Sequence, residues 1–322
     1  MKNVIFEIID EMAECLNIEQ QQRLQQVLVL KLSDNKFDNE KVDNDEYLRM
    51  FIEAKKIEGC SSRTTSYYCA TLKKFLDSVE MPARKISTEV VRNYLSDYQK
   101  INNSSNVTVD NVRRNISSFF SWMVEEDYLL KSPMTRIHKI RTTKKIKDII
   151  SDEAIELLRD RCKCQRDLAI IDLLYSTGIR VGELVKLNIS DINFEERECI
   201  VFGKGEKERK VYFDARTKLH LKSYISERCD NNPALFVTLD SPHDRLKISG
   251  VEIRLRELGK DLNIGRIHPH KFRRTMATRA IDKGMPIEQV QKILGHAQID
   301  TTLQYAIVNQ NNVKAAHRKF IS

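Results

Sequence analysis

Arginine, lysine and histidine side chains that could bind an anion occur in four short segments of the second half of this 322-residue sequence. The first segment, residues 176–184, contains Gly178, which is placed to end one helix, and Arg180, near the start of the next. Arg180 and Glu183 are three residues apart, so they share a helix face. An ion pair at this spacing is common in helices, so the segment alone is weak evidence of a site.

The second segment contains a lysine, and the third contains two histidines and two arginines. Lys204 lies in the hairpin turn Gly-Lys-Gly-Glu, where it would be exposed whether or not it has a function. In residues 267–274, Pro269 suits the first turn of a helix, so His270 and Arg273 would face the same way. Two histidines beside two arginines make an unusual group of anion-binding side chains.

The fourth segment ends with a tyrosine. A helix that begins at Pro286 would end at Gly295 and leave His296 just beyond its last turn. Asp300 is a candidate N-cap for the next helix, which carries Tyr305. A single tyrosine in such a helix is ordinarily a half-buried structural residue.

The elements that position these segments can be predicted from hydrophobic periodicity. Residues 1–45 indicate an amphipathic helix, to about residue 32, and an acidic linker. Residues 46–132 are helical in pattern throughout and predict a bundle of four short helices, with Trp122 and the neighbouring phenylalanine pair in its core. Residues 133–147 are rich in arginine and lysine and indicate a linker, which either stays solvated or follows DNA phosphates.

Residues 148–322 predict a mixed α+β domain. Helices surround three strand-like runs over residues 189–194, 198–202 and 209–213, and the last two flank the turn that contains Lys204. The expected fold is therefore mainly α with a small β-sheet: a helical N-terminal domain followed by a mixed catalytic domain.

Charge and composition favour a polyanionic partner inside the cell. The chain has a net charge of +8, and residues 1–45 contribute −5, so the remainder carries +13. Seven scattered cysteines, including an isolated Cys162-x-Cys164 pair, suggest reduced thiols rather than a metal site. The absence of a run of about 18 apolar residues and the acidic N-terminus predict a cytoplasmic protein that does not insert into a membrane.

Taken in order, R…K…H-x-x-R…G-H…Y resembles the tyrosine recombinase (phage integrase) family, which includes the Xer recombinases. Arg180 and Lys204 are 24 residues apart, Arg273 and His296 are 23 apart, and His296 and Tyr305 are 9 apart, similar to Xer-type members. The resemblance covers the whole catalytic domain, and residues 46–130 resemble the family's core-binding (SAM-like) domain without diagnostic motifs. It implies six catalytic residues: Arg180, Lys204, His270, Arg273, His296 and Tyr305.

Three further positions complete the comparison with the family. Glu183 matches the acidic residue that supports the first arginine. Arg274 stands where many members carry a second histidine, a supporting position, and His268 has the wrong spacing for the H-x-x-R pair.

The resemblance also implies the mechanism. Tyr305 would attack a DNA phosphate and form a 3′-phosphotyrosyl link, with two arginines and the histidines stabilising the transition-state charge. Because tyrosine has a pKa near 10, the attack needs nearby cations or a base, a role open to His270. Lys204 would protonate the leaving 5′ oxygen, and His296 would hydrogen-bond the phosphate. No metal, cofactor or ATP is expected, because arginines replace a metal ion and the covalent link conserves bond energy.

The implied partner is double-stranded DNA with inverted-repeat recombination sites. Two domains would grip opposite faces of the duplex, and four protomers would exchange strands through a Holliday junction. The segment 308–322 would pack on a neighbouring protomer, or alternatively on its own domain. Further DNA contacts are expected from Arg141, Lys144, Lys145, Lys147, Lys271 and Arg274.

Other functions compete with this interpretation. A type IB topoisomerase uses similar residues, but the Xer-like spacing and the helical domain argue against it. A DNA-binding regulator that kept the fold is disfavoured by the intact set of six residues. Within recombinases, the acidic residues 1–45 favour a mobile-element integrase or DNA invertase, with protomer contacts or regulation as their role, over an Xer-type chromosome resolvase.

Overall fold

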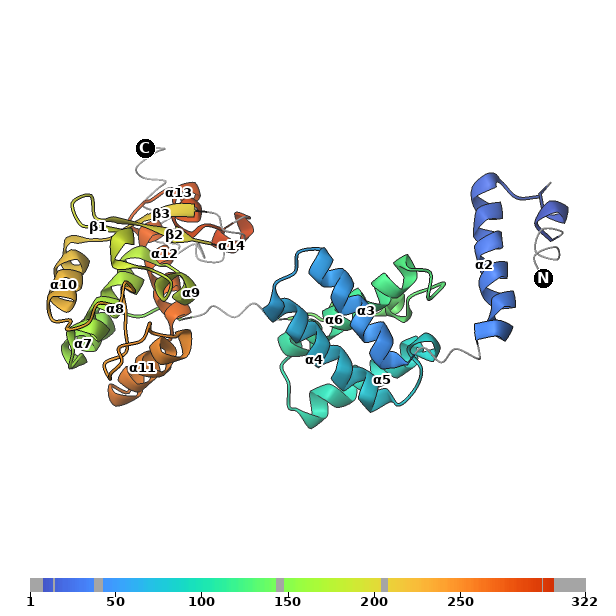
Figure 1. The fold of residues 1–322 in the computed structure, drawn as a ribbon, viewed down its shortest axis with the longest axis horizontal. Coiled ribbons are helices and arrows are strands. Elements are labelled where there is room, and N and C mark those ends of the chain that lie inside the picture. Colours follow the sequence, from blue (N-terminus) through green and yellow to red (C-terminus); the bar gives the residue numbers. More distant parts are fainter. Residues whose placement is uncertain are drawn as a thin grey trace, which may run out of the picture. The chain divides into compact units, whose positions relative to one another are not determined.

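A computed structural model describes residues 8–13, 15–37, 43–142, 148–203, 208–296 and 298–303. The chain forms two compact units, Met1–Lys145 and Ile146–Ser322 (Figure 1). The fold is mainly helical with a small antiparallel sheet, which confirms the predicted fold class. Within the described part of the chain, no helix is both long and apolar enough to cross a membrane.

The N-terminal helix starts later and ends later than the periodicity predicts. Helix α2 spans Ile18–Phe37, after a helical turn over residues 8–11. The Asn17 side chain accepts a hydrogen bond from the Gln20 backbone N–H, and the Gln20 side chain accepts one from the Asn17 N–H. This reciprocal cap sets the start of the helix at Ile18, so the helix is not continuous from the N-terminus.

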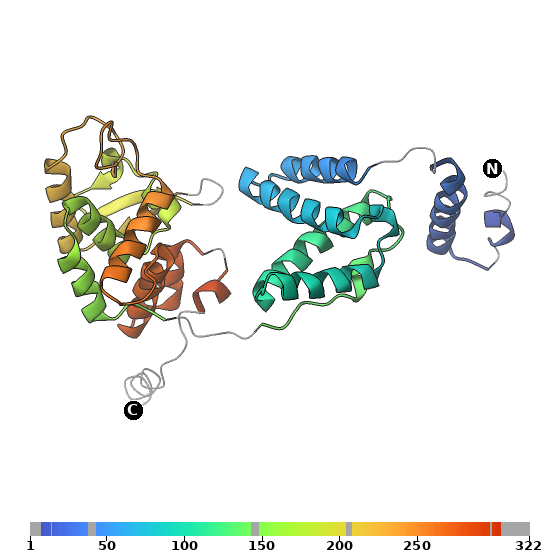
Figure 2. The same ribbon diagram turned by 90° about the horizontal axis from the view of Figure 1, so that it is seen from below.

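Four helices form the bundle of the first unit: α3 (Asn44–Ile57), α4 (Ser62–Val79), α5 (Thr88–Ile101) and α6 (Asn106–Glu125). Serine side chains at Ser61, Ser87 and Ser105 cap α4, α5 and α6 by accepting hydrogen bonds from backbone N–H groups of the first turns. Figure 2 shows the hairpins α3–α4 and α5–α6 packed on each other. Trp122 and its neighbours Phe119 and Phe120 are buried between them, as predicted.

The first part of the basic segment 133–147 packs against this bundle. Residues Pro133–Arg136 form a 3-10 helix with Met134 buried, and Ile137 and Ile140 pack against the bundle core. The Ile140 backbone N–H donates to the buried Asp110 carboxylate over 3.1 Å. These residues therefore extend the bundle, although the sequence suggested a linker from residue 133 onwards.

The second unit contains eight helices and one sheet among its described residues. The sheet has the order β1 (Ile192–Asn193), β2 (Glu198–Phe202), β3 (Glu208–Tyr212). The first strand is shorter than predicted, because Ile189–Asp191 is a 3-10 helix held by a hydrogen bond from the Asn188 N–H to the Asp191 carboxylate. The helices are α7 (Asp152–Arg161), α8 (Gln165–Thr177), α9 (Val181–Leu184), α10 (Ala215–Ser226), α11 (Ile248–Asp261), α12 (Pro269–Asp282), α13 (Ile287–Leu294) and α14 (Asp300–Leu303).

Helix α8 is the centre of this unit. Both α10 and α12 pack against it, and its side chains are buried on several faces, including Ile171, Leu173 and Leu174. The strand β3 lies beside α13 (Figure 1). The ends of α8 and α13, the start of α12 and the strand β3 therefore meet in one region, which contains several of the predicted functional residues.

Candidate active site

Arg180 and Glu183 form the ion pair predicted from their spacing. Gly178 ends α8 with φ of 62°, and the chain then turns through Arg180 into the short helix α9. The Arg180 backbone N–H donates to Glu183 Oε2 over 2.8 Å, and Arg180 Nη1 donates to Oε1 over 2.9 Å. Glu183 therefore caps the helix and orients the guanidinium at once, while 37% of the Arg180 side chain stays exposed.

A second arginine, not singled out from the sequence, binds the same carboxylate. Arg209 on β3 donates from Nη1 and Nη2 to the two oxygens of Glu183, over 2.8 and 2.7 Å. Burial favours a raised pKa for Glu183, but the hydrogen bonds from Arg209 and the Arg180 backbone outweigh burial and hold that pKa below its usual value. The sequence contains one indication of the position of Arg209. It is two and four residues before the apolar Val211 and Phe213, so it shares their inward face of the strand.

Arg273 joins the ends of two helices. Its side chain is buried, and Nη1 donates to the Gly178 carbonyl oxygen over 2.7 Å, while Nη2 donates to the Leu294 carbonyl oxygen over 2.5 Å. Both carbonyls lie at helix C-termini that end in a left-handed glycine, Gly178 after α8 and Gly295 after α13. A cation is stabilised there, because the last carbonyls of a helix lack intrahelical partners.

His270 lies near both arginines. It is in the first turn of α12, which begins at Pro269 as predicted. Its pKa is lowered by burial and by the positive charges of Arg273, Arg180 and Arg274. Arg273 and Arg274 lie on the same helix as His270, whereas the charge of Arg180 acts on it because the fold brings α9 to the start of α12.

His296 follows the end of α13 and is surrounded by positive charge. Its pKa is lowered to about 4, first by burial and then by the charges of Arg273, Arg180 and Arg209. Its Nδ1 is hydrogen-bonded to the hydroxyl of Thr302 over 2.8 Å, and Thr302 is fully buried in α14. Thr302 could not be selected from the sequence, because its contact with His296 depends on how α14 packs against α13.

The remaining predicted residues are only partly described by the structure. Lys204, Tyr305, Lys144, Lys145 and Lys147 lie outside the described residues. Arg141 is an exposed residue of the first unit, and its carbonyl oxygen accepts a hydrogen bond from Asn106. Lys271 is partly exposed on α12, and Arg274 donates from Nη1 to the Asp148 carbonyl oxygen over 2.9 Å.

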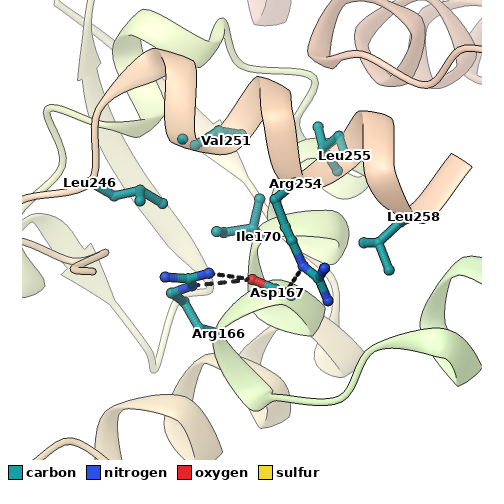
Figure 3. A pocket seen from close by; sticks show the side chains of 9 residues that line it. Arg166, Asp167, Ile170, Leu246, Val251, Arg254, Leu255 and Leu258 are labelled. Atoms are coloured by element: carbon teal, nitrogen blue, oxygen red, sulfur yellow. Dashed lines mark hydrogen bonds and ion pairs between the residues drawn. The ribbon is translucent and has the colours of Figure 1, made fainter. Parts of the chain in front are cut away.

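A small pocket between α8 and α11 is separate from this cluster (Figure 3). Arg166 and Arg254 both donate to the carboxylate of Asp167, and the remaining lining is apolar apart from Gly250. Of the predicted catalytic residues that the structure describes, none lines it. The ion pair of Arg254 with Asp167 joins α11 to α8, so the pocket is a feature of the packing of these two helices.

Comparisons with known proteins agree with this arrangement. The model of the Phage integrase family matches residues 148–312, and that of the Phage integrase, N-terminal SAM-like domain matches residues 47–129. The Tyrosine recombinase XerC of Oceanobacillus iheyensis is 28% identical over 293 residues, which cover 85% of this chain and 95% of the relative. The XerC of Staphylococcus aureus (strain bovine RF122 / ET3-1) is 29% identical over 282 residues, 83% of this chain and 93% of the relative.

A solved structure supports the same fold. XerH site-specific recombinase bound to palindromic difH substrate, in a post-cleavage complex, superposes with a TM-score of 0.69. The superposition covers 97% of this chain and 94% of the other, at 20% identity. The family match covers more than half of the sequence, including the full cluster of arginines and histidines. The chain belongs to the phage integrase family and is a tyrosine recombinase, an enzyme that breaks and rejoins DNA.

Proposed function

We propose that Tyr305 attacks a DNA phosphate held by Arg180 and Arg273 and forms a 3′-phosphotyrosyl link. The observation that carries this proposal is the convergence of Arg180, Arg273, His270 and His296 from three separate segments, seen in their contacts and in the lowered pKa values of both histidines. Arginine is permanently cationic and matches two phosphate oxygens with its planar fork. Tyr305 is two residues beyond the described end of α14, whose Thr302 holds His296.

The charge of the cluster suits the transition state. Arg180 and Arg209 bind the carboxylate of Glu183, and Arg273 adds a third guanidinium at the adjoining helix ends. The cluster therefore carries a net charge of +2 when both histidines are neutral. A phosphodiester gains negative charge as it becomes pentavalent. Cations that are already fixed by hydrogen bonds to backbone carbonyls stabilise that charge without reorganising.

The two histidines are suited to accept a proton and to form a hydrogen bond with the phosphate. A lowered pKa keeps His270 and His296 neutral at pH 7, and a neutral imidazole can accept a proton. We assign the acceptance of the Tyr305 proton to His270 and a hydrogen bond to the scissile phosphate to His296. Lys204 would donate the proton that the leaving 5′ oxygen needs.

The assembly we propose is four protomers on two inverted-repeat DNA sites, which exchange strands through a Holliday junction. The helical bundle and the catalytic unit would grip opposite faces of the duplex, joined by the basic residues 143–147. Lys271, Arg274 and Arg141 would add phosphate contacts, and the segment 308–322 would pack on a neighbouring protomer.

For the biological role, we propose a mobile-element integrase or DNA invertase. The acidic N-terminal 45 residues favour this role, and the XerC match leaves 15% of the chain uncovered. The XerC likeness itself favours a second candidate, a chromosome resolvase. Plasmids that carry two copies of the repeats flanking the gene, in direct or inverted orientation, distinguish them. Inversion or joining of these repeats supports the first role, whereas recombination only at a chromosomal site supports the second.

A further inference from the structure

Arg209 connects strand β3 to the two sides of the cluster, α9 and α13. It is the second residue of β3, five residues after Lys204, and pairs with Val201 of β2. Only 11% of its side chain is exposed. Besides its two hydrogen bonds to Glu183, its Nε donates to the carbonyl oxygen of Ile293 over 2.9 Å. One guanidinium therefore joins β3, α9 and α13.

The contact with α13 is unusually close. A Cβ atom at Gly295 would lie 3.0 Å from Cδ and 3.1 Å from Nε of Arg209, so the arginine stem packs on the bare backbone of this glycine. Gly295 has φ of 64° and directly precedes His296. The position of Arg209 and the turn that presents His296 therefore depend on each other.

The contact with α9 determines how Arg180 is held. Glu183 is 5% exposed and accepts four hydrogen bonds, two from Arg180 and two from Arg209. A buried carboxylate needs such partners, and without Arg209 the exposed Arg180 would be the only side chain bound to it. Arg180 would then be drawn towards Glu183 instead of remaining available to a phosphate.

We propose that Arg209 is a positioning residue for DNA cleavage: it fixes Arg180, the His296 turn and strand β3 relative to one another. This inference rests on the proposed function of the cluster. Arg209 itself touches no substrate atom in this account, so removing it should slow the chemical step more than it weakens DNA binding. Lysine keeps the charge but lacks the planar fork, so it should restore only part of the rate.

The test compares single-turnover cleavage of nicked recombination-site DNA, at saturating full-length protein, with DNA affinity and thermal unfolding. We expect Arg209→Met to cleave about 100-fold more slowly, the loss typical of small misplacements, with a much smaller change in Kd. Arg209→Lys should be intermediate. Arg228→Met is the matched control, because Arg228 is also largely buried and forms an ion pair with Asp230 and hydrogen bonds to backbone carbonyls outside the cluster. It should unfold at a lower temperature and cleave at the wild-type rate.

Two further variants test whether Arg209 acts through its planar fork and through Glu183. If Arg209→Met does not fold, Arg209→Lys decides, and a wild-type rate in that variant contradicts a need for the fork. Combining Arg209→Met with Glu183→Gln should restore stability, because no buried charge is left unpaired, but not the rate. Full recovery of the rate, or a loss explained entirely by weaker DNA binding, would overturn the inference. No adduct with the wild-type protein would instead contradict the proposed function.

Discussion

Arg273 donates a hydrogen bond to the carbonyl oxygen of Gly178 over 2.7 Å, although 95 residues separate them. The contact satisfies the C-terminus of α8 and fixes a buried cation next to the start of α9. The conformation of Gly178 is thus coupled to the position of the arginine that we assign to the phosphate.

Gly178→Ala should lower the free energy of unfolding by about 1–2 kcal/mol, the cost of a left-handed non-glycine residue. The new methyl would also lie 2.3 Å from Cε of Met276, which must move. Gly182→Ala is the control, because its Cβ would be 3.9 Å from Ile248 and its φ is not left-handed. Chemical denaturation measures both, and equal stabilities of the two variants would contradict this explanation.

Thr302→Val should release the imidazole of His296. The lost hydrogen bond contributes about 1 kcal/mol, so cleavage should slow about fivefold. Thr217→Val removes a comparable buried hydroxyl that donates to Asp214 over 2.7 Å in α10. In single-turnover assays this control should cleave at the wild-type rate even if it is less stable. An unchanged rate for Thr302→Val would show that the Thr302 hydroxyl does not orient His296.

The lowered pKa of His296 predicts a specific pH dependence. An unfolded histidine binds a proton near pH 6.5, whereas folded His296 has a pKa of about 4. Its contribution to stability is therefore fully present above pH 6.5 and is lost as the pH falls towards 4. An NMR titration, assigned with His296→Gln, should show the ring titrating near pH 4 without DNA and at a higher pH with DNA bound. A His296 pKa near 6.5 in the DNA-free protein would contradict the placement of three arginines close to a buried ring.

Glu183 should stabilise the folded protein when its side chain is charged, whereas His296 should do so when its ring is neutral. Because its folded pKa is lowered, its contribution is present above the ordinary value of 4.5 and is lost as the pH falls through the folded pKa. Glu183→Gln should therefore be less stable than wild type at pH 7, with a difference that shrinks at acid pH. Glu195→Gln, at an exposed position, controls for the loss of one negative charge. A difference independent of pH would mean that Glu183 is not held as an anion.

The sequence predicted the local parts of the site well. The three-residue spacing of Arg180 and Glu183 predicted their ion pair, and Pro269 and Gly295 marked helix ends that the structure confirms. These features depend on a few consecutive residues, whose conformations follow from local steric and hydrogen-bonding preferences.

Contacts across elements were not predictable in the same way. Arg209 and Thr302 reach Glu183 and His296 only after β3 and α14 pack against α13. A single sequence contains no signal for such packing beyond alternation along a strand. The start of the N-terminal helix was predicted wrongly for a related reason. The apolar spacing runs through Asn17 without a break, but the side-chain hydrogen bonds between Asn17 and Gln20 begin a new helix there.

The most direct test of the central claim is a search for a covalent protein–DNA adduct. Wild-type protein and Tyr305→Phe would each be mixed with nicked DNA from the repeats that flank the gene, and an SDS-resistant complex would be sought by electrophoresis. We predict an adduct with the wild-type protein and none with Tyr305→Phe, which lacks the attacking oxygen. An adduct that persists in Tyr305→Phe would contradict the assignment of the nucleophile. Tight DNA binding without any adduct would contradict cleavage itself.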